Sequence, residues 1–423
     1  MTKARRTRSG SNLKALGCSL LLLTAVPAVA QAAKITSADV RSWCFTSAKI
    51  ATDLRIGGCS ALISSGKATA KRLTDAYLNR GAHYLGNNST DLAIDDFSEV
   101  IRREPKRFAA FTNRGEAYRR KGDLDRAISD FDRAIALNQK DAIAWFNRGI
   151  AYSDKGDPDH AIADYDLAIK LNPRDSWYYN NRGNSHIDKR DYERAMADYN
   201  KAIKLNPKFT LAYFNRGTAY RNHGDDALAL ADLNMSIQFD ANYAAAYGNR
   251  ARLFRDKGDI DRALADFDQS LRLDPAGYRD AYARGTIYFD RHDYARALPD
   301  YDRAIKANPK YAAALNSRCL TRAIVGSPRE GLADCEESLK HRPGDAYTLD
   351  SRAFCYLKLG EFAAAIEGYD TALKVNPKLA PSLYGRGLAK QKQGDASGAE
   401  SDIAAAKAID AGVADEFRHY GID

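Results

Sequence analysis

A spacing of 34 residues recurs through most of this 423-residue chain and limits what the chain can fold into. A small residue, usually Gly, stands at ten positions separated by that interval without insertion, and Ala follows twelve residues later in nine of the ten copies. The small residues are Gly81, Gly115, Gly149, Gly183, Gly217, Ala251, Gly285, Cys319, Ala353 and Gly387. A period of this length is typical of a repeat protein, in which each unit packs only against its neighbours.

Each unit predicts two amphipathic helices joined by a tight turn. With the small residue counted as position 8, the residues at positions 4, 8 and 11 share one helix face, and those at 20, 24 and 27 share a second. Between the helices stands Gly-Asp, as in Gly156-Asp157, where Gly suits the left-handed end of the first helix and Asp caps the second. A proline at the end of most units, such as Pro173, stops the second helix. We therefore expect ten antiparallel hairpins that bury their apolar faces against one another.

These residues resemble the tetratricopeptide repeat family. The resemblance covers residues 74–413 and implies an all-α fold, a right-handed α-solenoid superhelix of stacked antiparallel helix hairpins. Residues 34–73 are expected to form a degenerate leading helical hairpin, and residues 414–423 a C-terminal cap. The ten expected units are 74–107, 108–141, 142–175, 176–209, 210–243, 244–277, 278–311, 312–345, 346–379 and 380–413.

Residues 1–33 have the pattern of a secretory signal peptide. Basic residues precede an uncharged stretch over residues 15–33, which small residues close at Ala30-Gln31-Ala32. A retained membrane anchor is the alternative, although Pro27 inside the stretch disfavours a helix in lipid. We expect cleavage, no membrane span afterwards, and an exported protein that is periplasmic if the source is a Gram-negative bacterium.

Arg occupies position 7 in all ten units, and Asp stands sixteen residues later, at position 23, in nine of them. The pairs begin with Arg80 and Asp96 and end with Arg386 and Asp402, and Gly368 is the exception. A planar guanidinium can make two parallel hydrogen bonds to a carboxylate, which Lys cannot. We interpret the pattern as an ion pair between the two helices of each unit, in preference to a row of anion-binding sites.

Asn occupies position 6 of the first six units, from Asn79 to Asn249, and is then absent. A carboxamide both donates and accepts hydrogen bonds, so it can hold the backbone of an extended peptide whatever the peptide's side chains. Local contacts within the helix are the alternative role. The series resembles the asparagine ladder in the repeat superhelix of O-linked N-acetylglucosamine transferases, and in the tetratricopeptide repeat family the first helix of each unit lines the concave face.

Aromatic side chains at other positions expected on the concave face would anchor such a peptide. Together with the Asn series they define the candidate peptide-binding residues, which are Asn113, Asn147, Asn181, Asn215, Asn249, Phe146, Trp177, Phe214, Asn180 and Asn184. The character of the repeats changes at the seventh unit. Position 4 turns from aromatic to aliphatic there, Pro299 lies inside the second helix, and His292 replaces the usual Gly. We expect changed curvature and two functional sections that divide near residue 278.

Cysteines provide a further prediction. In an oxidising compartment, Cys319 at position 8 and Cys335 at position 24 would face each other within one hairpin and form a disulfide. Cys44 and Cys59, which are 15 residues apart, have nearly the same arrangement in the leading hairpin, and small buried thiols are the alternative for both pairs. Cys355 would then remain unpaired.

No pattern in the chain indicates catalysis. The seven His residues fall at unrelated repeat positions, so we expect no metal, no cofactor and no enzyme activity. The formal net charge of +9 includes five basic residues within 1–33, and the remaining excess is too small to indicate nucleic-acid binding. The sequence therefore predicts a protein-protein interaction scaffold that binds an extended peptide or partner segment in its concave groove. The alternative is a structural assembly factor of a cell-envelope complex that uses the convex face or the ends. The oligomeric state stays open.

Overall fold

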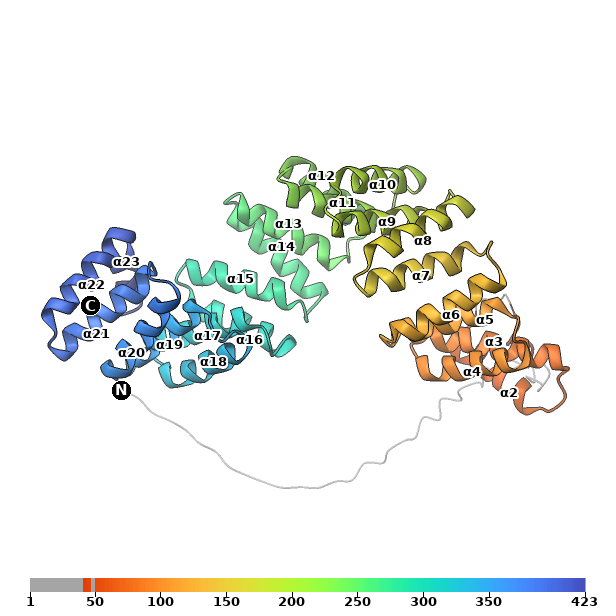
Figure 1. Ribbon diagram of the computed structural model, residues 1–423, viewed down its shortest axis with the longest axis horizontal. Coiled ribbons are helices and arrows are strands. Elements are labelled where there is room, and N and C mark those ends of the chain that lie inside the picture. The colour runs from red at the N-terminus through yellow and green to blue at the C-terminus, as the bar shows by residue number, and fades with distance from the viewer. Residues whose placement is uncertain (1–40, 47–49, 423) are drawn as a thin grey trace, which may run out of the picture. The chain divides into compact units, whose positions relative to one another are not determined.

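A computed structural model describes residues 41–46 and 50–422, so the expected signal peptide and part of the leading hairpin lie outside the described residues. All the regular elements in the described ranges are α-helices, arranged in tandem pairs, which confirms the predicted α-solenoid class (Figure 1). The first helices of the ten repeats, here called A helices, are α3 (Ala70–Gly86), α5 (Phe108–Arg120), α7 (Ala142–Asp154), α9 (Ser176–Asp188), α11 (Thr210–His223), α13 (Ala244–Asp256), α15 (Tyr278–Asp290), α17 (Ala312–Ile324), α19 (Ala346–Leu359) and α21 (Ala380–Gln393).

The second helices of the repeats, here called B helices, have the same period. They are α4 (Thr90–Arg103), α6 (Leu124–Leu137), α8 (Pro158–Leu171), α10 (Tyr192–Leu205), α12 (Asp226–Phe239), α14 (Ile260–Leu273), α16 (Tyr294–Ala307), α18 (Pro328–His341), α20 (Phe362–Val375) and α22 (Ala396–Ile409). Two helices flank the repeats, α2 (Thr52–Ser64) before them and α23 (Val413–His419) after them. The first A helix begins earlier than the expected residue 74, because the Thr69 side chain caps it by accepting a hydrogen bond from the Arg72 backbone N–H.

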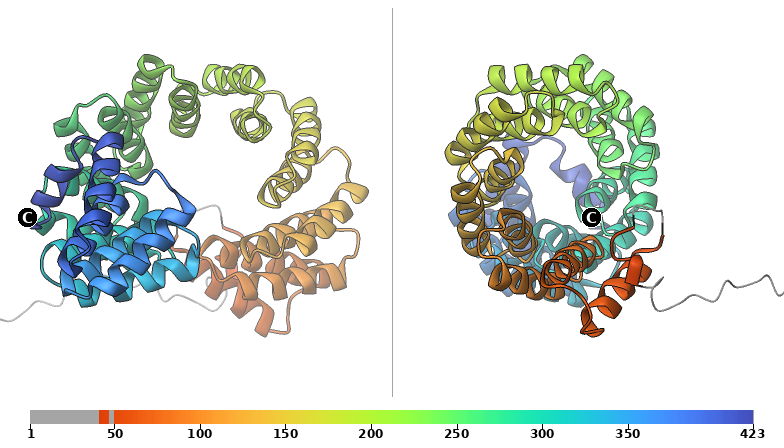
Figure 2. Two further views of the ribbon diagram at one scale, coloured as in Figure 1. Left: turned by 60° about the vertical axis from the view of Figure 1, so that its left-hand side comes forward. Right: turned by 90° about the vertical axis from the view of Figure 1, so that its right-hand side faces the viewer.

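The chain divides into two compact units after Asp123. Unit 1 contains α2 to α5, and unit 2 contains α6 to α23. Within unit 2 the hairpins follow one another in chain order along a curved array (Figure 2). This division falls inside repeat 2, between its A and B helices, and does not coincide with the change of sequence character near residue 278.

The two helices of each hairpin approach closely where the sequence places its small residues. A Cβ atom added to Gly149 would lie 2.7 Å from the Tyr165 ring, and one added to Gly183 would lie 2.8 Å from the Tyr199 ring. Both tyrosines are almost completely buried, as are the alanines at position 20. Because the B-helix ring occupies the space of the missing side chain, position 8 accepts only a small residue in these hairpins.

Turns between the paired helices use the predicted chemistry. The Asp157 side chain accepts a hydrogen bond from the His160 backbone N–H at the start of α8, and Asp191 and Asp259 cap their helices in the same way. His292 adopts the left-handed conformation that Gly supplies in other repeats, with φ of 58°. Pro299 lies inside α16, which runs from Tyr294 to Ala307, so this proline does not end the helix.

The regular spacing of Arg and Asp places the position 7 Arg of an A helix against carboxylates on two B helices. This arrangement is called the clamp below. In repeat 3, Arg148 Nε and Nη2 donate to the two carboxylate oxygens of Asp164 at 2.8 and 2.7 Å, and Nη1 donates to Asp132 at 2.6 Å. Asp164 lies on the B helix of the same repeat, whereas Asp132 lies on the B helix of the preceding repeat. The position 7 arginine therefore joins its own hairpin and also fastens it to the one before.

This clamp recurs along the chain. The two-pronged contact with Asp at position 23 forms in at least eight repeats. The predicted ion pair is thus present, and the contact with the preceding repeat adds a partner that the sequence analysis did not identify. Hydrogen bonding to Asp198 raises the pKa of Arg182 above its ordinary value, so the guanidinium stays charged.

Both expected cysteine pairs lie at bonding distance. Cys44 is joined to Cys59 and Cys319 to Cys335, with Cα atoms 4.5 and 5.5 Å apart. Cys355 is buried, and its sulfur lies 3.6 Å from that of Cys319. Burial raises the pKa of the Cys355 thiol to about 12, which keeps it protonated near neutral pH. Within the described ranges, no helix has both the length and the apolar character needed to cross a membrane.

Replacing Arg182 by Lys tests the clamp. We expect Arg182→Lys to lower the free energy of unfolding by about 1–3 kcal/mol, because an ammonium cannot bridge Asp198 and Asp166 at once and leaves a buried carboxylate short of a donor. Urea denaturation followed by hydrogen exchange in α9 and α10 measures the loss. Arg352→Lys is the matched control, since Gly368 provides no carboxylate in repeat 9 and Arg352 Nε has no hydrogen-bond partner. Equal destabilisation by the two changes would contradict the clamp.

Candidate functional site

The A helices form the inner side of the curved array in unit 2. Successive A helices contact each other at α7–α9, α9–α11, α11–α13, α15–α17, α17–α19 and α19–α21, whereas no comparable contact joins successive B helices there. Helices that approach each other line the concave side of a curved stack, and Figure 2 shows this curvature. The face lined by the A helices of repeats 3–10 is therefore the place to look for a binding site.

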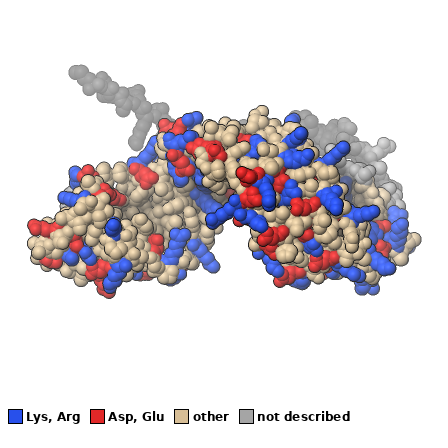
Figure 3. Space-filling view, turned by 45° about the horizontal axis from the view of Figure 1, so that its top comes forward, with Lys and Arg blue, Asp and Glu red and all other residues tan. Residues whose placement is uncertain are grey.

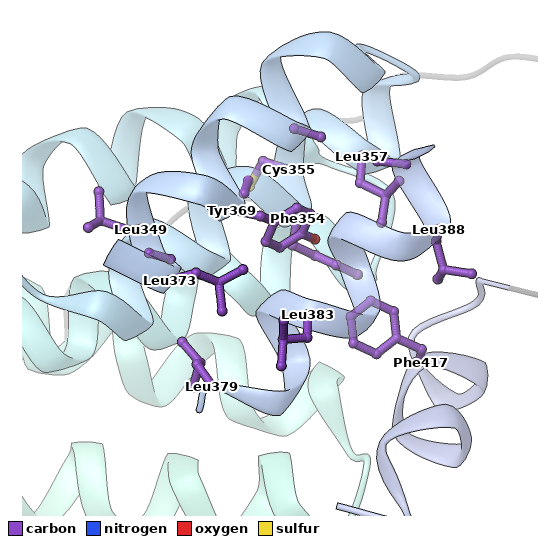
Figure 4. Packing of buried hydrophobic residues seen from close by; sticks show 14 of the residues in the cluster. Leu349, Phe354, Cys355, Leu357, Tyr369, Leu373, Leu379, Leu383, Leu388 and Phe417 are labelled. Carbon is purple, nitrogen blue, oxygen red and sulfur yellow. The ribbon is translucent and has the colours of Figure 1, made fainter. Parts of the chain in front are cut away.

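At the C-terminal end of unit 2, this face is occupied by the protein itself. The Phe417 ring of α23 lies 5.7 Å from the Phe354 ring of α19 and 4.9 Å from the Tyr384 ring of α21, measured between centroids. Figure 4 shows Phe417 facing the leucines of α21. Phe417 and Val413 are almost completely buried by these contacts. Residues 414–423 were expected to cap the end of the stack, but α23 and the residues after it lie against A helices instead.

The segment after α23 extends this coverage back to repeat 7. Lys358 Nζ donates to the Tyr420 carbonyl oxygen at 3.0 Å, and the Tyr420 ring packs against Phe354 and against Phe289 of α15. The His419 ring stacks on His292 with centroids 4.2 Å apart. Residues 413–420 therefore reach the A helices of repeats 7, 9 and 10.

Repeats 3 and 4 carry exposed apolar side chains on their A helices. Ile143 and Trp177 stand at position 2 of consecutive repeats and are 57% and 47% exposed. Trp177 packs on Phe209, with ring centroids 4.7 Å apart, which orients the indole and leaves much of it open to solvent. A neighbouring pair of exposed apolar groups on rigid helices is typical of an interaction surface.

The other two predicted aromatic anchors have a larger part in packing. Phe146 is partly buried and contacts Tyr178 of the next repeat and Tyr165 of its own B helix, with centroids 4.7 and 5.8 Å apart. Phe214 meets Tyr243 edge to face at 5.0 Å. Of the three predicted anchors, Trp177 is the one that the structure leaves substantially exposed.

Several side chains of the Asn series make hydrogen bonds within the chain. Asn181 and Asn249 each donate from Nδ2 to the backbone carbonyl four residues earlier, and Asn215 Nδ2 donates to the side chain of Asn180. Asn147 makes no hydrogen bond to the described parts of the chain. Asn113 lies on α5 in unit 1. The alternative role, local helix contacts, therefore accounts for the donors of Asn181 and Asn249, the Asn215 donor contacts the preceding repeat, and acceptor oxygens remain at Asn181 and Asn215.

Two other candidate residues accept hydrogen bonds within the stack. Asn180 is only 3% exposed, and its Oδ1 accepts the hydrogen bond from Asn215, so it has little surface to offer a peptide. Asn184 is partly exposed, and its Oδ1 accepts from the Tyr199 hydroxyl at 2.7 Å. The side chain at position 5, where Asn180 lies, points between repeats, whereas the sequence period placed it on the concave face.

Basic and acidic side chains are interspersed on the face drawn in Figure 3, which shows no large area of a single charge. Among the described residues, no three His, Cys, Asp or Glu side chains are grouped as metal ligands would be. The exposed apolar side chains and the amide oxygens of the A-helix face can make apolar contacts and hydrogen bonds.

Comparison with known proteins identifies the repeats. Models of the tetratricopeptide repeat match residues 78–137, 114–176, 176–209, 198–231, 249–312 and 282–320, and a further TPR repeat model matches residues 355–394. These matches span more than half of the sequence. The chain belongs to the tetratricopeptide repeat family.

Solved structures of repeat proteins are similar in part. A tetratricopeptide repeat protein from Parabacteroides merdae is 22% identical, covers 59% of this chain and 98% of its own, and has a TM-score of 0.49. YrrB, described as a TPR protein with an unusual peptide-binding site, is 26% identical, with 44% and 97% covered and a TM-score of 0.35. MamA is 24% identical, with 38% and 94% covered and a TM-score of 0.35. A search of curated proteins gives no match.

Asp350, a partly exposed residue of α19, has a pKa that differs between the folded and the unfolded chain. Asp350 of α19 accepts a hydrogen bond from the Ser382 hydroxyl at 2.6 Å. Burial, with a smaller contribution from the negative charge of Glu416, raises the pKa of Asp350 to about 7, although the Ser382 hydrogen bond opposes this shift. In the unfolded chain the same group has a pKa of about 4. The folded protein therefore holds a proton on Asp350 that the unfolded chain has lost.

We expect Asp350 to contribute most to the free energy of unfolding below about pH 4, where the group is protonated in both the folded and the unfolded chain. This contribution of Asp350 is lost as the pH rises from about 4 to about 7. The Asp350→Asn variant stays uncharged and should unfold with a flatter pH dependence, measured by urea denaturation and hydrogen exchange of α23 at pH 5 and pH 8. Glu367→Gln, at an exposed site on α20, is the control for removing one carboxyl group. The assignment is wrong if Asp350→Asn keeps the pH dependence of the unmodified protein.

Proposed function

We propose that the chain is a non-enzymatic scaffold of an exported compartment, which binds an extended peptide or a segment of a partner protein on the concave face of repeats 3–6. Members of the tetratricopeptide repeat family bind proteins or peptides. One observation carries the proposal for this chain. The protein's own C-terminal segment contacts A helices in repeats 7, 9 and 10, and the exposed side chains of Ile143 and Trp177 lie on the A helices of repeats 3 and 4, outside these contacts; Tyr347, at the same position of repeat 9, is also exposed.

Binding would be distributed over several repeats. Ile143 and Trp177 provide apolar anchors, and the carboxamide oxygens of Asn181 and Asn215 can accept hydrogen bonds from peptide N–H groups. Asn147, with no internal partner, can both donate and accept. Because backbone groups are common to all peptides, the Asn side chains hold the segment and the apolar anchors select it.

An exported location is supported by two independent features. The pattern of residues 1–33 is that of a secretory signal peptide. The close approach of both cysteine pairs fits a compartment in which disulfides form and persist. The proposal therefore concerns the chain that remains after cleavage near residue 33.

Truncating the exposed anchors tests the proposal. Ile143→Ala/Trp177→Ala should reduce binding of the partner segment at least about 30-fold, because a central Trp contributes about 2 kcal/mol or more to such interfaces. The measurement is capture from the exported fraction by the immobilised chain, followed by titration of the captured protein or its peptides. Circular dichroism and thermal unfolding establish that the variant is folded.

Leu228→Ala is the matched control, since Leu228 is 50% exposed on the B helix α12. It should bind like the unmodified chain. If the double variant binds equally well and Leu228→Ala does not, the partner uses the outer helices, and a structural assembly factor becomes the better account.

A further inference from the structure

Three cysteine sulfurs lie together in the core of repeats 8 and 9. Cys319 on α17 is bonded to Cys335 on α18, and Cys355 on α19 carries a free thiol. The Cys355 sulfur lies 3.6 Å from that of Cys319, and all three side chains are fully buried. Figure 4 shows Cys355 among the buried residues of this core. A free thiol in contact with a disulfide is the arrangement from which thiol–disulfide exchange proceeds.

The sequence departs from the repeat pattern at these cysteines and at one residue beside them. Cys occurs at none of the equivalent positions in the other repeats, and position 20, which is Ala in nine repeats, is Gly331 in repeat 8. A Cβ atom at residue 331 would lie 3.1 Å from the Cys355 sulfur and 2.7 Å from the Cys319 carbonyl oxygen. Gly331 therefore leaves the space in which the Cys355 sulfur lies beside Cys319.

Exchange between these cysteines needs no oxidant or reductant. The Cys355 thiol loses its proton to a base from solvent, and the thiolate attacks the Cys319 sulfur. A bond forms between Cys319 and Cys355 while the bond between Cys319 and Cys335 breaks, and the Cys335 sulfur leaves with the electron pair and takes up a proton. One disulfide and one thiol are present before and after the step. Since bonded sulfurs are about 2.05 Å apart, the Cys355 and Cys319 sulfurs must approach by about 1.5 Å.

The surroundings of Cys355 oppose the loss of its proton. Burial, with a smaller contribution from the negative charge of Asp334 on α18, raises the pKa of the Cys355 thiol to about 12. Arg318 and Arg322 of α17 pair with Asp334 at 2.5 and 2.8 Å and offset part of its charge. Tyr369 of α20 is a further titratable neighbour, and burial raises the pKa of its hydroxyl. Exchange is therefore slow near neutral pH and becomes faster as the pH rises.

The two pairings connect different parts of the stack. The bond between Cys319 and Cys335 lies inside the hairpin of repeat 8. A bond between Cys319 and Cys355 joins α17 to α19, the A helices of repeats 8 and 9, which already pack against each other. In that form α18 has lost its covalent link to α17. The exchange thus moves a covalent link from within one repeat to between two repeats.

We propose that Cys355 exchanges with the Cys319–Cys335 disulfide, so that the folded protein exists in two forms, one with the bond inside repeat 8 and one with the bond between repeats 8 and 9. The inference does not depend on peptide binding, because it concerns the core of repeats 8 and 9 and not the exposed side chains of repeats 3 and 4. A bond between neighbouring repeats restrains the angle between them, whereas a bond inside one repeat does not. The two forms therefore differ in how freely this part of the array bends.

The experiment locates the free thiol in the chain from residue 34 onwards, with no thiol or oxidant added. Folded protein stored at pH 5 is moved to pH 6, 8 or 9, sampled over several days, denatured in acid and alkylated with N-ethylmaleimide. Trypsin cuts after Arg318, Arg329 and Arg352, so mass spectrometry finds the three cysteines in separate peptides.

We expect label on both Cys355 and Cys335, with Cys335 holding at least about a tenth of the label after incubation at pH 9. The approach to the final ratio should be about tenfold faster for each added pH unit, because the pKa of Cys355 lies above this range. Hydrogen exchange of α18 should become faster as the share of label on Cys335 grows, since that helix loses its covalent link to α17.

Controls establish the source of the new thiol. Cys44 and Cys59 form a disulfide in unit 1, and neither should be alkylated under any of these conditions. The Cys355→Ser variant has no attacking thiol and should show no label on Cys319 or Cys335. Dilution of the protein about tenfold should leave the rate unchanged, because the exchange takes place within one molecule.

A second variant tests the new bond directly. Cys335→Ser, folded with oxidised glutathione, should form a disulfide between Cys319 and Cys355, which non-reducing peptide mapping detects. Two free thiols in the folded variant would overturn the inference. The label on the unmodified chain decides the question even if Cys335→Ser fails to fold.

Other results would also overturn the inference. Label confined to Cys355 at every pH shows that no exchange occurs. Label on Cys335 that persists in Cys355→Ser, or that forms in proportion to the protein concentration, shows that the thiol has another source. Label on Cys319 assigns a bond between Cys335 and Cys355, which is not the pairing proposed.

Discussion

The arginine at position 7 is the contact on which the regular stacking of this protein depends. It reaches from an A helix to a buried Asp of its own B helix and to the B helix of the preceding repeat, as Arg148 does with Asp164 and Asp132. One planar group with several donors satisfies these partners at fixed angles, which explains why Lys never replaces it. The clamp is absent in repeat 9, where Gly368 replaces Asp, and in this part of the chain the Cys319–Cys335 bond and the packing of α23 add other links.

Regular stacking gives every repeat a similar inner surface. A binding site at particular repeats therefore requires that the A-helix face differ from one repeat to another. In unit 2 the difference arises from the occupants of the A-helix face. Phe417 and Tyr420 cover it near the C-terminal end, and Ile143 and Trp177 leave it open nearer the start of the unit.

Features that repeat every 34 residues could be predicted from the sequence, and features that interrupt the period could not. The helix pairs, the Asp caps, the approach of Gly149 to Tyr165 and the pairing of Cys319 with Cys335 each depend on contacts inside one hairpin. The contact of Arg148 with Asp132 crosses between repeats, although Asp or Asn sixteen residues before most of these arginines was a readable signal. The burial of Asn180 and the position of α23 depend on the angle between repeats, which no local pattern specifies.

The account's central claim is that a partner lies on the inner helices of repeats 3–6. Site-specific photocrosslinking tests it most directly, with a photoreactive amino acid placed singly at residue 143 on α7, residue 167 on α8 and residue 409 at the end of α22. Leu167 and Ile409 are exposed apolar residues on B helices, so all three sites accept the label without disturbing the core. The account predicts partner adducts from residue 143 and none from residues 167 or 409. Adducts from residue 167 or 409, with none from residue 143, would contradict it.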